Sequence, residues 1–262
     1  MIDMYNKNYI DEKTQVYTEI LDEIDSTNEE AKRRIKEGAS KDFVLVARKQ
    51  TAGKGRKGRS FYSPKDTGIY LTFTHFTYEA AEDVLKVTVA TSVIAAKAIK
   101  DALNIDCGIK WVNDLYYNGK KVSGTLCEYI FKGTYENIRN AVIVGIGINL
   151  STEDFPEEIS GKAGALISAD NNSSCFDDIV IGISNGLNLF FENCDLNAYM
   201  PLYKKLSVVI GREVELSDAS GFVDKGTVED FDEEGAIIIR KISGELKRYD
   251  SGEISLMLNQ NQ

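Results

Sequence analysis

The sequence predicts an α+β protein, in which a mixed β-sheet flanked by helices is followed by a small β-barrel. Residues 141–150 are almost wholly apolar, which is typical of a central strand buried on both faces. Residues 84–103 carry apolar side chains at helical spacing. After residue 206, short strand-like segments alternate with turns, and this pattern is typical of a small barrel. We therefore expect one domain over residues 1–206 and a second over residues 207–262.

The expected elements of the first domain follow each other along the chain. Ser26 begins a helix that runs to about residue 36 and ends at Gly38, and Glu29 stands three residues on, at the spacing of a capping box. The Asn118-Gly119 pair predicts a tight hairpin turn. Strands are expected at residues 16–24, 43–47, 68–74, 109–111, 121–129 and 141–150, and helical spacing at residues 84–103, 179–191 and 200–206.

The expected elements of the second domain are shorter. Strand patterns occur at residues 208–216, 221–223, 225–228, 236–239 and 245–249. In the first domain, residues 151–174 form a polar loop region with a short segment around Leu166.

Composition excludes several classes of function. The formal net charge of −10 argues against a general nucleic-acid-binding protein. A single histidine, His75, excludes histidine-cluster metal sites and disfavours a serine–histidine–aspartate mechanism. No apolar run is long enough for a membrane span, no secretory signal is present, and the four cysteines show no paired spacing, so we expect a cytoplasmic protein with free thiols.

A glycine-rich basic loop at residues 53–58 is the first candidate site. Seven Lys/Arg and no Asp/Glu lie between Arg48 and Lys65, which makes this a local basic patch on an acidic chain. Glycines let the backbone N–H groups approach an anion, and the interleaved Lys and Arg neutralise its charge. The segment matches neither a Walker A motif nor a dinucleotide fingerprint. From the residues alone, a small-anion site and a mobile basic surface loop both remain open.

Two further segments carry polar groups within apolar surroundings. Lys110, Asn113 and Asp114 lie before the hairpin turn and Lys121 after it, so Asp114 and Lys121 are expected to face one site. A salt bridge at a strand edge is the plainer interpretation of that pair. Gly145 and Gly147 interrupt the apolar strand, which ends near Asn149. Two glycines inside a strand indicate either a close approach by a ligand or a tight crossing of strand and helix.

The segment Ser26-Thr27-Asn28 is open to two interpretations, as helix caps or as polar ligands. Its combination with the other motifs is more specific than any one of them. Taken in order with residues 50–59, 110–114, 121–124, Glu128 and 145–149, it resembles biotin–protein ligase, and the similarity continues to residues 252–256 near the C-terminus.

This resemblance implies the fold of class II aminoacyl-tRNA synthetases and biotin synthetase-like proteins, with an SH3-like C-terminal domain at 207–262 after a catalytic ligase domain at 1–206. It implies ATP, Mg²⁺ and biotin as reactants, a biotinyl-5′-AMP intermediate, and the biotin carboxyl carrier protein as acceptor. Mg²⁺ is expected to enter mainly with the ATP phosphates. A homodimer is compatible with the resemblance. Interaction with DNA or a membrane is not expected.

The resemblance also implies roles for individual residues. The catalytic groups would be Arg56, Lys121 and Asp114. Biotin would be bound by Ser26, Thr27, Asn28, Gln50, Gly53, Lys54, Gly55, Arg56, Lys121 and Gly124. ATP would be bound by Lys54, Arg56, Phe61, Asn113, Lys121 and Asn149.

The sequence departs from the family pattern at two positions. Lys54 replaces the usual Arg, which keeps the charge but loses the planar fork, and Val112 replaces the usual Pro. Members that also repress transcription carry an N-terminal DNA-binding domain, whereas residues 1–25 contain no helix-turn-helix pattern, so repression is not expected.

Two rival functions remain open. A lipoate or octanoate ligase shares the fold and the acyl-adenylate chemistry, although Gln50 and the loop at residues 53–58 favour biotin. A non-catalytic nucleotide sensor would not need Arg56, Asp114 and Lys121 together.

Overall fold

The computed structural model describes residues 5–78, 84–131, 140–168, 175–218 and 220–256. Within them, the first part of the chain forms a seven-stranded mixed sheet in the order β1-β2-β3-β7-β6-β5-β4. The pair β1–β2 is parallel and every other neighbouring pair is antiparallel. The strands are β1 (Tyr17–Leu21), β2 (Phe43–Ala47), β3 (Gly68–Thr77), β4 (Gly108–Lys110), β5 (Asp114–Tyr117), β6 (Lys120–Ile130) and β7 (Asn140–Asn149).

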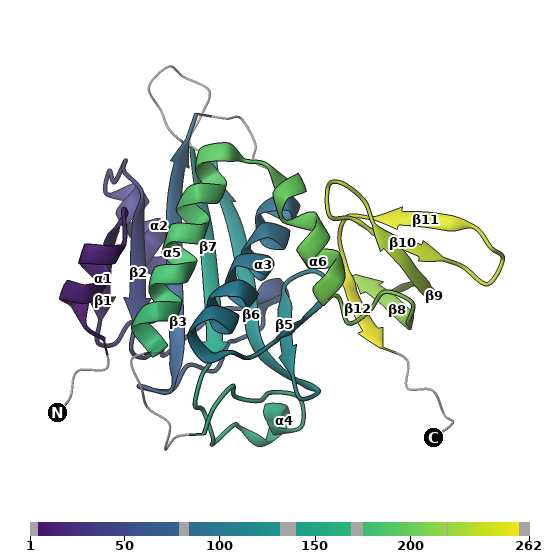
Figure 1. Cartoon of the computed structure of the whole chain (residues 1–262), viewed down its shortest axis with the longest axis horizontal. Coiled ribbons are helices and arrows are strands. Elements are labelled where there is room, and N and C mark those ends of the chain that lie inside the picture. The colour runs from purple at the N-terminus through teal and green to yellow at the C-terminus, as the bar shows by residue number, and fades with distance from the viewer. Residues whose placement is uncertain (1–4, 79–83, 132–139, 169–174, 219, 257–262) are drawn as a thin grey trace.

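Helices cover both faces of this sheet (Figure 1). Helices α3 (Val84–Leu103) and α5 (Cys175–Asn193) pack against each other on one face, and α2 (Thr27–Lys36) lies on the other, against β3 and β7. The remaining helices are α1 (Lys7–Lys13), α4 (Glu157–Ser160) and α6 (Met200–Leu206), with short 3₁₀ turns at Arg56–Gly58 and Leu196–Ala198. The sequence pattern did not indicate α1, and it placed α4 within a loop.

The central strand β7 explains how the two faces differ. Successive side chains of a strand point to opposite faces. Val142, Val144, Ile146 and Ile148 join the large core with α3 and α5, whereas Ala141 and Ile143 join a smaller apolar cluster that includes Ala31 and Ile35 of α2. Gly145 and Gly147 continue the α2 face and leave it without side chains there. The sheet therefore has a strip of bare backbone beside the N-terminus of α2.

Local sequence patterns account for several element bounds. The expected strand at residues 43–47 and the expected helix at residues 84–103 are confirmed with these bounds. The strand is buried throughout, and the helix is buried from Val87 to Ile99 except at Lys97. Asn118 and Gly119 both have positive φ, 49° and 75°, as a two-residue hairpin turn between β5 and β6 requires.

The capping box expected at the start of α2 is not formed. Ser26 occupies the N-cap, but its side chain makes no capping hydrogen bond. Glu29, which should have reached back to the N-cap, instead forms ion pairs with Lys32 and Lys54. A tertiary partner outside the helix has replaced the local one.

The C-terminal part of the chain forms a five-stranded antiparallel sheet in the order β11-β10-β9-β8-β12. Its strands are β8 (Glu213–Asp218), β9 (Gly221–Phe231), β10 (Ile237–Arg240), β11 (Leu246–Tyr249) and β12 (Glu253–Leu256). The separate strands expected at 221–223 and 225–228 were wrong, because β9 runs through both with a register shift opposite β8. The expected strand at 208–216 begins only at Glu213, and β12 supplies the fifth strand.

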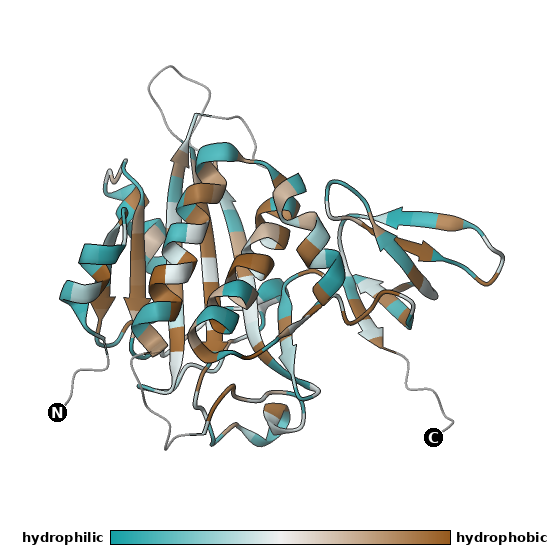
Figure 2. Ribbon diagram, in the orientation of Figure 1, coloured by the Kyte–Doolittle hydropathy of each residue, from teal (hydrophilic) through white to brown (hydrophobic). Residues whose placement is uncertain are grey.

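The small sheet contacts the first part of the chain at α6 and at the residues between β4 and β5. Trp111 donates its indole N–H to the carbonyl oxygen of Gly235 at 3.0 Å, and the rings of Tyr203 and Phe231 lie 5.1 Å apart, edge to face. Figure 2 shows β2 and β7 largely hydrophobic, whereas β11 is largely hydrophilic. Among the helices that the structure describes, none combines the length and the apolar character needed to cross a membrane.

Candidate functional site

The strip of bare backbone at Gly145 and Gly147 of β7 is the centre of the candidate site. A Cβ atom at Gly145 would overlap Asn28 Oδ1, and one at Gly147 would lie 2.5 Å from Cε1 of Phe61. The two glycines therefore admit the N-terminus of α2 and the aromatic ring that follows the basic loop. Asn149, which is almost fully buried, continues the same face two residues further along the strand. Both glycines mark a close crossing of protein groups.

Ser26, Thr27 and Asn28 are all buried at the start of α2. The backbone N–H and the hydroxyl of Thr27 both donate to Gln50 Oε1, at 2.9 and 3.0 Å. Gln50 in turn donates from Nε2 to Ser63 Oγ at 2.9 Å. Two segments far apart in sequence are thus joined by side-chain amide and hydroxyl groups.

Asn28 is held by both oxygen and nitrogen of its amide. The hydroxyl of Thr72 lies 2.7 Å from Asn28 Oδ1 and 2.7 Å from Thr27 Oγ1. Asn28 Nδ2 donates to Glu128 Oε2 at 2.9 Å. The amide orientation is therefore fixed by a hydroxyl on one side and a carboxylate on the other, which presents a defined set of polar groups beside Gly145.

The basic loop is folded back on itself. Phe61 N–H donates to the carbonyl oxygen of Gly53 at 2.8 Å, and Gly55 N–H donates to that of Arg59 at 2.7 Å. The guanidinium of Arg59 reaches Glu253 of β12 at 2.5 Å. The alternative of an unattached surface loop does not describe these residues, since backbone hydrogen bonds and an ion pair to the small sheet hold them.

Arg56 connects this loop to the hairpin. Its guanidinium Nη1 donates to Asn113 Oδ1 at 3.1 Å, and Asn113 is itself anchored because its Nδ2 donates to the carbonyl oxygen of Thr125 at 2.9 Å. The residue before Asn113 is Val112, and the Trp111–Val112 peptide bond is cis.

The hairpin brings Asp114 and Lys121 together. Lys121 Nζ lies 2.6 Å from Asp114 Oδ1, with both side chains partly exposed. Gly124 lies opposite Asp114 in the β5–β6 register, and a Cβ atom there would lie 3.1 Å from Lys121 Nζ. Glycine at 124 therefore leaves the space that the Lys121 side chain occupies.

Lys110 is a further cation near Asp114, and the sequence pattern predicted no role for it. Its Nζ lies 5.6 Å from the ring centroid of Tyr116, and burial lowers the pKa of its ammonium group, while nearby Asp114 acts in the opposite direction. A lysine within an otherwise apolar β segment was the signal available in the sequence.

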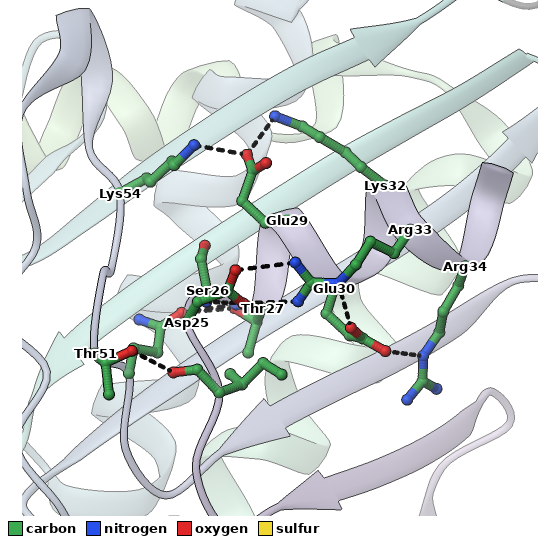
Figure 3. A network of polar contacts seen from close by, with 12 residues as sticks. Asp25, Ser26, Thr27, Glu29, Glu30, Lys32, Arg33, Arg34, Thr51 and Lys54 are labelled. Carbon is green, nitrogen blue, oxygen red and sulfur yellow. Dashed lines mark hydrogen bonds and ion pairs between the residues drawn. The ribbon is translucent and has the colours of Figure 1, made fainter.

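The first turn of α2 carries a second group of charges (Figure 3). Lys54 Nζ lies 2.9 Å and Lys32 Nζ 2.8 Å from the same oxygen, Oε1 of Glu29. Hydrogen bonds from Lys32 and Lys54 lower the pKa of the Glu29 carboxyl group. Lys32 also reaches Glu128 Oε1 at 2.7 Å. Sequence reasoning missed this group because Glu29 fits a capping pattern, and it assigned no role to Thr72 or Ser63 either.

The arrangement offers cations close to polar side chains. Lys54, Arg56 and Lys121 come from two motifs: Lys54 pairs with Glu29 next to the buried Asn28, Arg56 donates to the half-buried Asn113, and Lys121 pairs with Asp114. Such a set favours a ligand that carries both an anionic group and a hydrogen-bonding ring. In the described part of the chain, no cluster of three or more His, Cys, Asp or Glu side chains is suited to hold a metal ion.

Comparison with known proteins gives matches over most of the chain. The model of the "Biotin/lipoate A/B protein ligase family" matches residues 20–149, and that of the "Biotin protein ligase C terminal domain" matches residues 209–257. The curated "Bifunctional ligase/repressor BirA" of Bacillus subtilis is 27% identical over 252 residues, covering 93% of this chain and 76% of that protein. A "Biotin--[acetyl-CoA-carboxylase] ligase" of Paracoccus denitrificans is 36% identical over 138 residues, covering 50% of this chain and 54% of that protein.

Solved structures agree in fold. The biotin protein ligase of Aquifex aeolicus, solved in complex with biotin and ATP, superposes with a TM-score of 0.74 at 30% sequence identity. The match covers 93% of this chain and 99% of the Aquifex protein.

Proposed function

The chain belongs to the biotin protein ligase family, and from that premise we propose that it joins biotin to one lysine of a biotin carboxyl carrier protein through a biotinyl-5′-AMP intermediate. The family and the class of enzyme, a ligase that attaches biotin to a carboxylase, follow from the comparisons. The intermediate, the carrier protein and the residue roles are the content of the proposal.

The observation that carries the proposal is the hydrogen bond between Arg56 and Asn113. It spans 57 residues of sequence and brings the basic loop beside the hairpin that holds Lys121 and Asp114. Arg56 and Lys121, cations from two separate motifs, are therefore held by the adjacent residues Asn113 and Asp114. A reaction that joins a carboxylate to a phosphate needs nearby cations, because two anions must approach each other and negative charge builds up on the phosphate oxygens.

The proposed first step forms an acyl phosphate bond. A biotin carboxylate oxygen attacks the α-phosphorus of ATP, the bond from that phosphorus to the bridging oxygen breaks, and pyrophosphate leaves with the electron pair. Arg56 and Lys121 would stabilise the added negative charge, and their positions are set by Asn113 and Asp114 before any ligand arrives.

The proposed second step transfers the biotinyl group. The uncharged amine of the acceptor lysine attacks the acyl carbon, the carbon–oxygen bond to AMP breaks, and the amine gives up a proton. Asp114 is the carboxylate beside Lys121 and would accept or guide that proton. This step needs no nucleophile from the chain itself.

The polar residues around Gly145 would bind the ring of biotin. Its ureido group has both N–H donors and a carbonyl acceptor, and the matching groups are supplied by Ser26, Thr27, Asn28 and Gln50. The loop residues Gly53, Lys54, Gly55 and Arg56 would bind the carboxylate and the α-phosphate, with Gly124 beside Lys121. On the nucleotide side, we assign Phe61, Asn113 and Asn149 to ATP.

Mg²⁺ would accompany ATP. It prefers oxygen ligands and retains several waters, so phosphate oxygens would supply most of its coordination. Asp114 supplies a carboxylate oxygen nearby, although in the structure this group is paired with Lys121. We therefore assign no dedicated metal site to the chain.

Two further parts of the proposal concern the whole chain. We assign residues 1–206 to the catalytic ligase domain and residues 207–262 to the SH3-like domain, supported by the two separate sheets and the two family models. We also propose that the protein does not bind DNA, which its net charge of −10 supports.

Biotin is favoured over lipoate by the polarity of the ring site. The dithiolane ring of lipoate offers no N–H or carbonyl group, so it could form none of the hydrogen bonds that Ser26, Thr27, Asn28 and Gln50 would make with the ureido group of biotin. Sites built to hydrogen-bond a substrate discriminate against an analogue that lacks the matching groups. The C-terminal family model, which names biotin alone, points the same way.

Isotope exchange between pyrophosphate and ATP tests the intermediate. With Mg²⁺ present, we expect exchange that requires biotin and needs no carrier protein, since the first step is reversible. Exchange of equal rate without biotin would contradict an acyl-adenylate, and exchange supported by lipoate alone would contradict the assignment of the acid.

A further inference from the structure

A line of ion pairs joins the basic loop to the buried polar residues. It begins at Lys54, passes through the carboxylate of Glu29 to Lys32, and continues to Glu128, whose second oxygen accepts from Asn28. Figure 3 shows the ammonium groups of Lys54 and Lys32 both directed at Glu29. The loop cation is thus linked to the ring-binding amide through charged groups that hold one another.

Glu29 is fixed more firmly than Lys54. The Lys54 side chain is 48% exposed, whereas that of Glu29 is 27% exposed and has Lys32 as a second partner. A free lysine side chain samples many rotamers, and ordering it costs conformational entropy. Its partner on α2 therefore determines where the Lys54 ammonium lies before a ligand binds.

The ammonium of Lys54 retains the capacity to bind an anion. It has three N–H donors, of which the contact with Glu29 engages one. An incoming carboxylate can therefore bind to the same ammonium without displacing Glu29.

The loop's other central cation is held elsewhere. Arg56 donates to Asn113 at the start of the hairpin, whereas Lys54 is held over the first turn of α2, next to Asn28. Two cations separated by one residue are therefore directed to opposite parts of the site.

We propose that Glu29 is a positioning residue, which holds Lys54 on the acid side of the site so that Lys54 serves the biotin carboxylate while Arg56 serves the nucleotide. This inference rests on the proposed function. It assigns to Glu29 a role in the affinity for the acid, although the residue carries the same sign of charge as the acid.

The sign of that effect separates positioning from simple electrostatics. Removing a negative charge near an anion site strengthens anion binding if only Coulomb attraction matters. If Glu29 acts by ordering Lys54, Glu29→Gln weakens binding instead. Partly exposed ion pairs contribute little, so the expected loss of biotin affinity is about three- to fivefold.

Glu30 provides a matched control. It lies in the same turn of α2, its side chain is 20% exposed, and it forms two ion pairs, with Arg33 and Arg34. Glu30→Gln therefore makes the same chemical change, at a similar depth and with the same number of ion pairs lost, at a site that holds no loop cation.

Calorimetric titration of the full chain with biotin, without ATP, tests the inference. We expect Glu29→Gln to bind biotin about three- to fivefold more weakly than the wild type, and Glu30→Gln to bind it equally well. In a Lys54→Met background, Glu29→Gln should have no further effect, because the group it positions is gone. Unchanged or tighter binding by Glu29→Gln, or the same loss in the Lys54→Met background, would overturn the inference.

The outcomes also separate this inference from the proposed function. A wild-type protein that binds no biotin would defeat the proposed function itself. A wild-type protein that binds biotin, together with a Glu29→Gln variant that behaves like Glu30→Gln, would defeat only the role of Glu29.

Discussion

Lys121 Nζ lies 2.6 Å from Asp114 Oδ1, across a two-residue turn that reverses the chain between them. The Lys121 side chain is 34% exposed and that of Asp114 is 22% exposed, so the pair borders solvent and can be reached by a ligand. Asp114 orients the ammonium while leaving donors free. The hairpin thus fixes a cation beside Arg56 and Asn113.

Replacement of Lys121 tests its role in the first step. Lys121→Met removes a charge that would stabilise the transition state, and we expect biotin-dependent pyrophosphate exchange to fall by about 10²- to 10³-fold. Lys120→Met is the matched control, since the neighbouring ammonium donates to the carbonyl oxygen of Ser160 at 3.1 Å, away from Asp114. Equal rates for the two variants would refute a catalytic role for Lys121.

A methyl group at position 145 tests the ring site. In Gly145→Ala the new Cβ would overlap Asn28 Oδ1, and Asn28 would have to give up its contacts with Thr72 and Glu128. We expect biotin to bind about tenfold more weakly, the effect of losing one to two hydrogen bonds. Gly161→Ala serves as control because nothing lies within 4 Å of its added Cβ. If both variants bind biotin as the wild type does, the ring does not bind beside Asn28.

Arg56 is expected to retain the intermediate. Its guanidinium joins the loop to Asn113, so Arg56→Ala should loosen the loop over the adenylate and speed release of biotinyl-5′-AMP about tenfold. Release can be followed by trapping labelled adenylate after a single turnover without carrier protein. Lys65→Ala, which removes a cation of the same basic stretch that is paired with Asp22, should leave release unchanged. A release rate for Arg56→Ala equal to that of this control would argue against a capping role.

Acid sensitivity of the α2 region follows from Asp25. Hydrogen bonds from Arg33 lower the pKa of the Asp25 carboxyl group to about 2, compared with about 3.9 in an unfolded chain. Because the folded-state pKa is the lower one, the ionised group stabilises the fold above about pH 4, and this contribution is lost as the pH falls towards 2. The contribution is small, because both side chains are more than 40% exposed.

Urea denaturation at a series of pH values measures this effect. At pH 5, Asp25→Asn should unfold at a lower urea concentration than the wild type, and the difference should shrink as the pH falls from 4 to 2.5. A difference that stays constant over this range would contradict the linkage.

Much of the fold was predictable because the relevant signals are local. The bounds of β2 follow from a continuous apolar run, and those of α3 follow from apolar residues at helical spacing. The hairpin follows from Asn118 and Gly119. The small helix α1 was missed because only Ile10 within it is fully buried, which leaves almost no apolar period to detect.

The site was less accessible to such reasoning. Local pattern assigned Glu29 to a helix cap, yet in the folded chain it binds Lys54 from another segment, and no local spacing reports that competition. The contact of Arg56 with Asn113 likewise depends on the order of strands in the sheet. The motifs were brought together in advance only by their resemblance to a known family, and the distances between them came from the structure.

The most direct test of the account is transfer of labelled biotin to a biotin carboxyl carrier domain. Purified protein with ATP and Mg²⁺ should label one lysine of the carrier, and Lys121→Met should lose this activity while Lys120→Met retains it. Labelled lipoate in place of biotin should give no transfer. Transfer of lipoate but not biotin, or no transfer of either by a protein that is folded and binds ATP, would contradict the central claim.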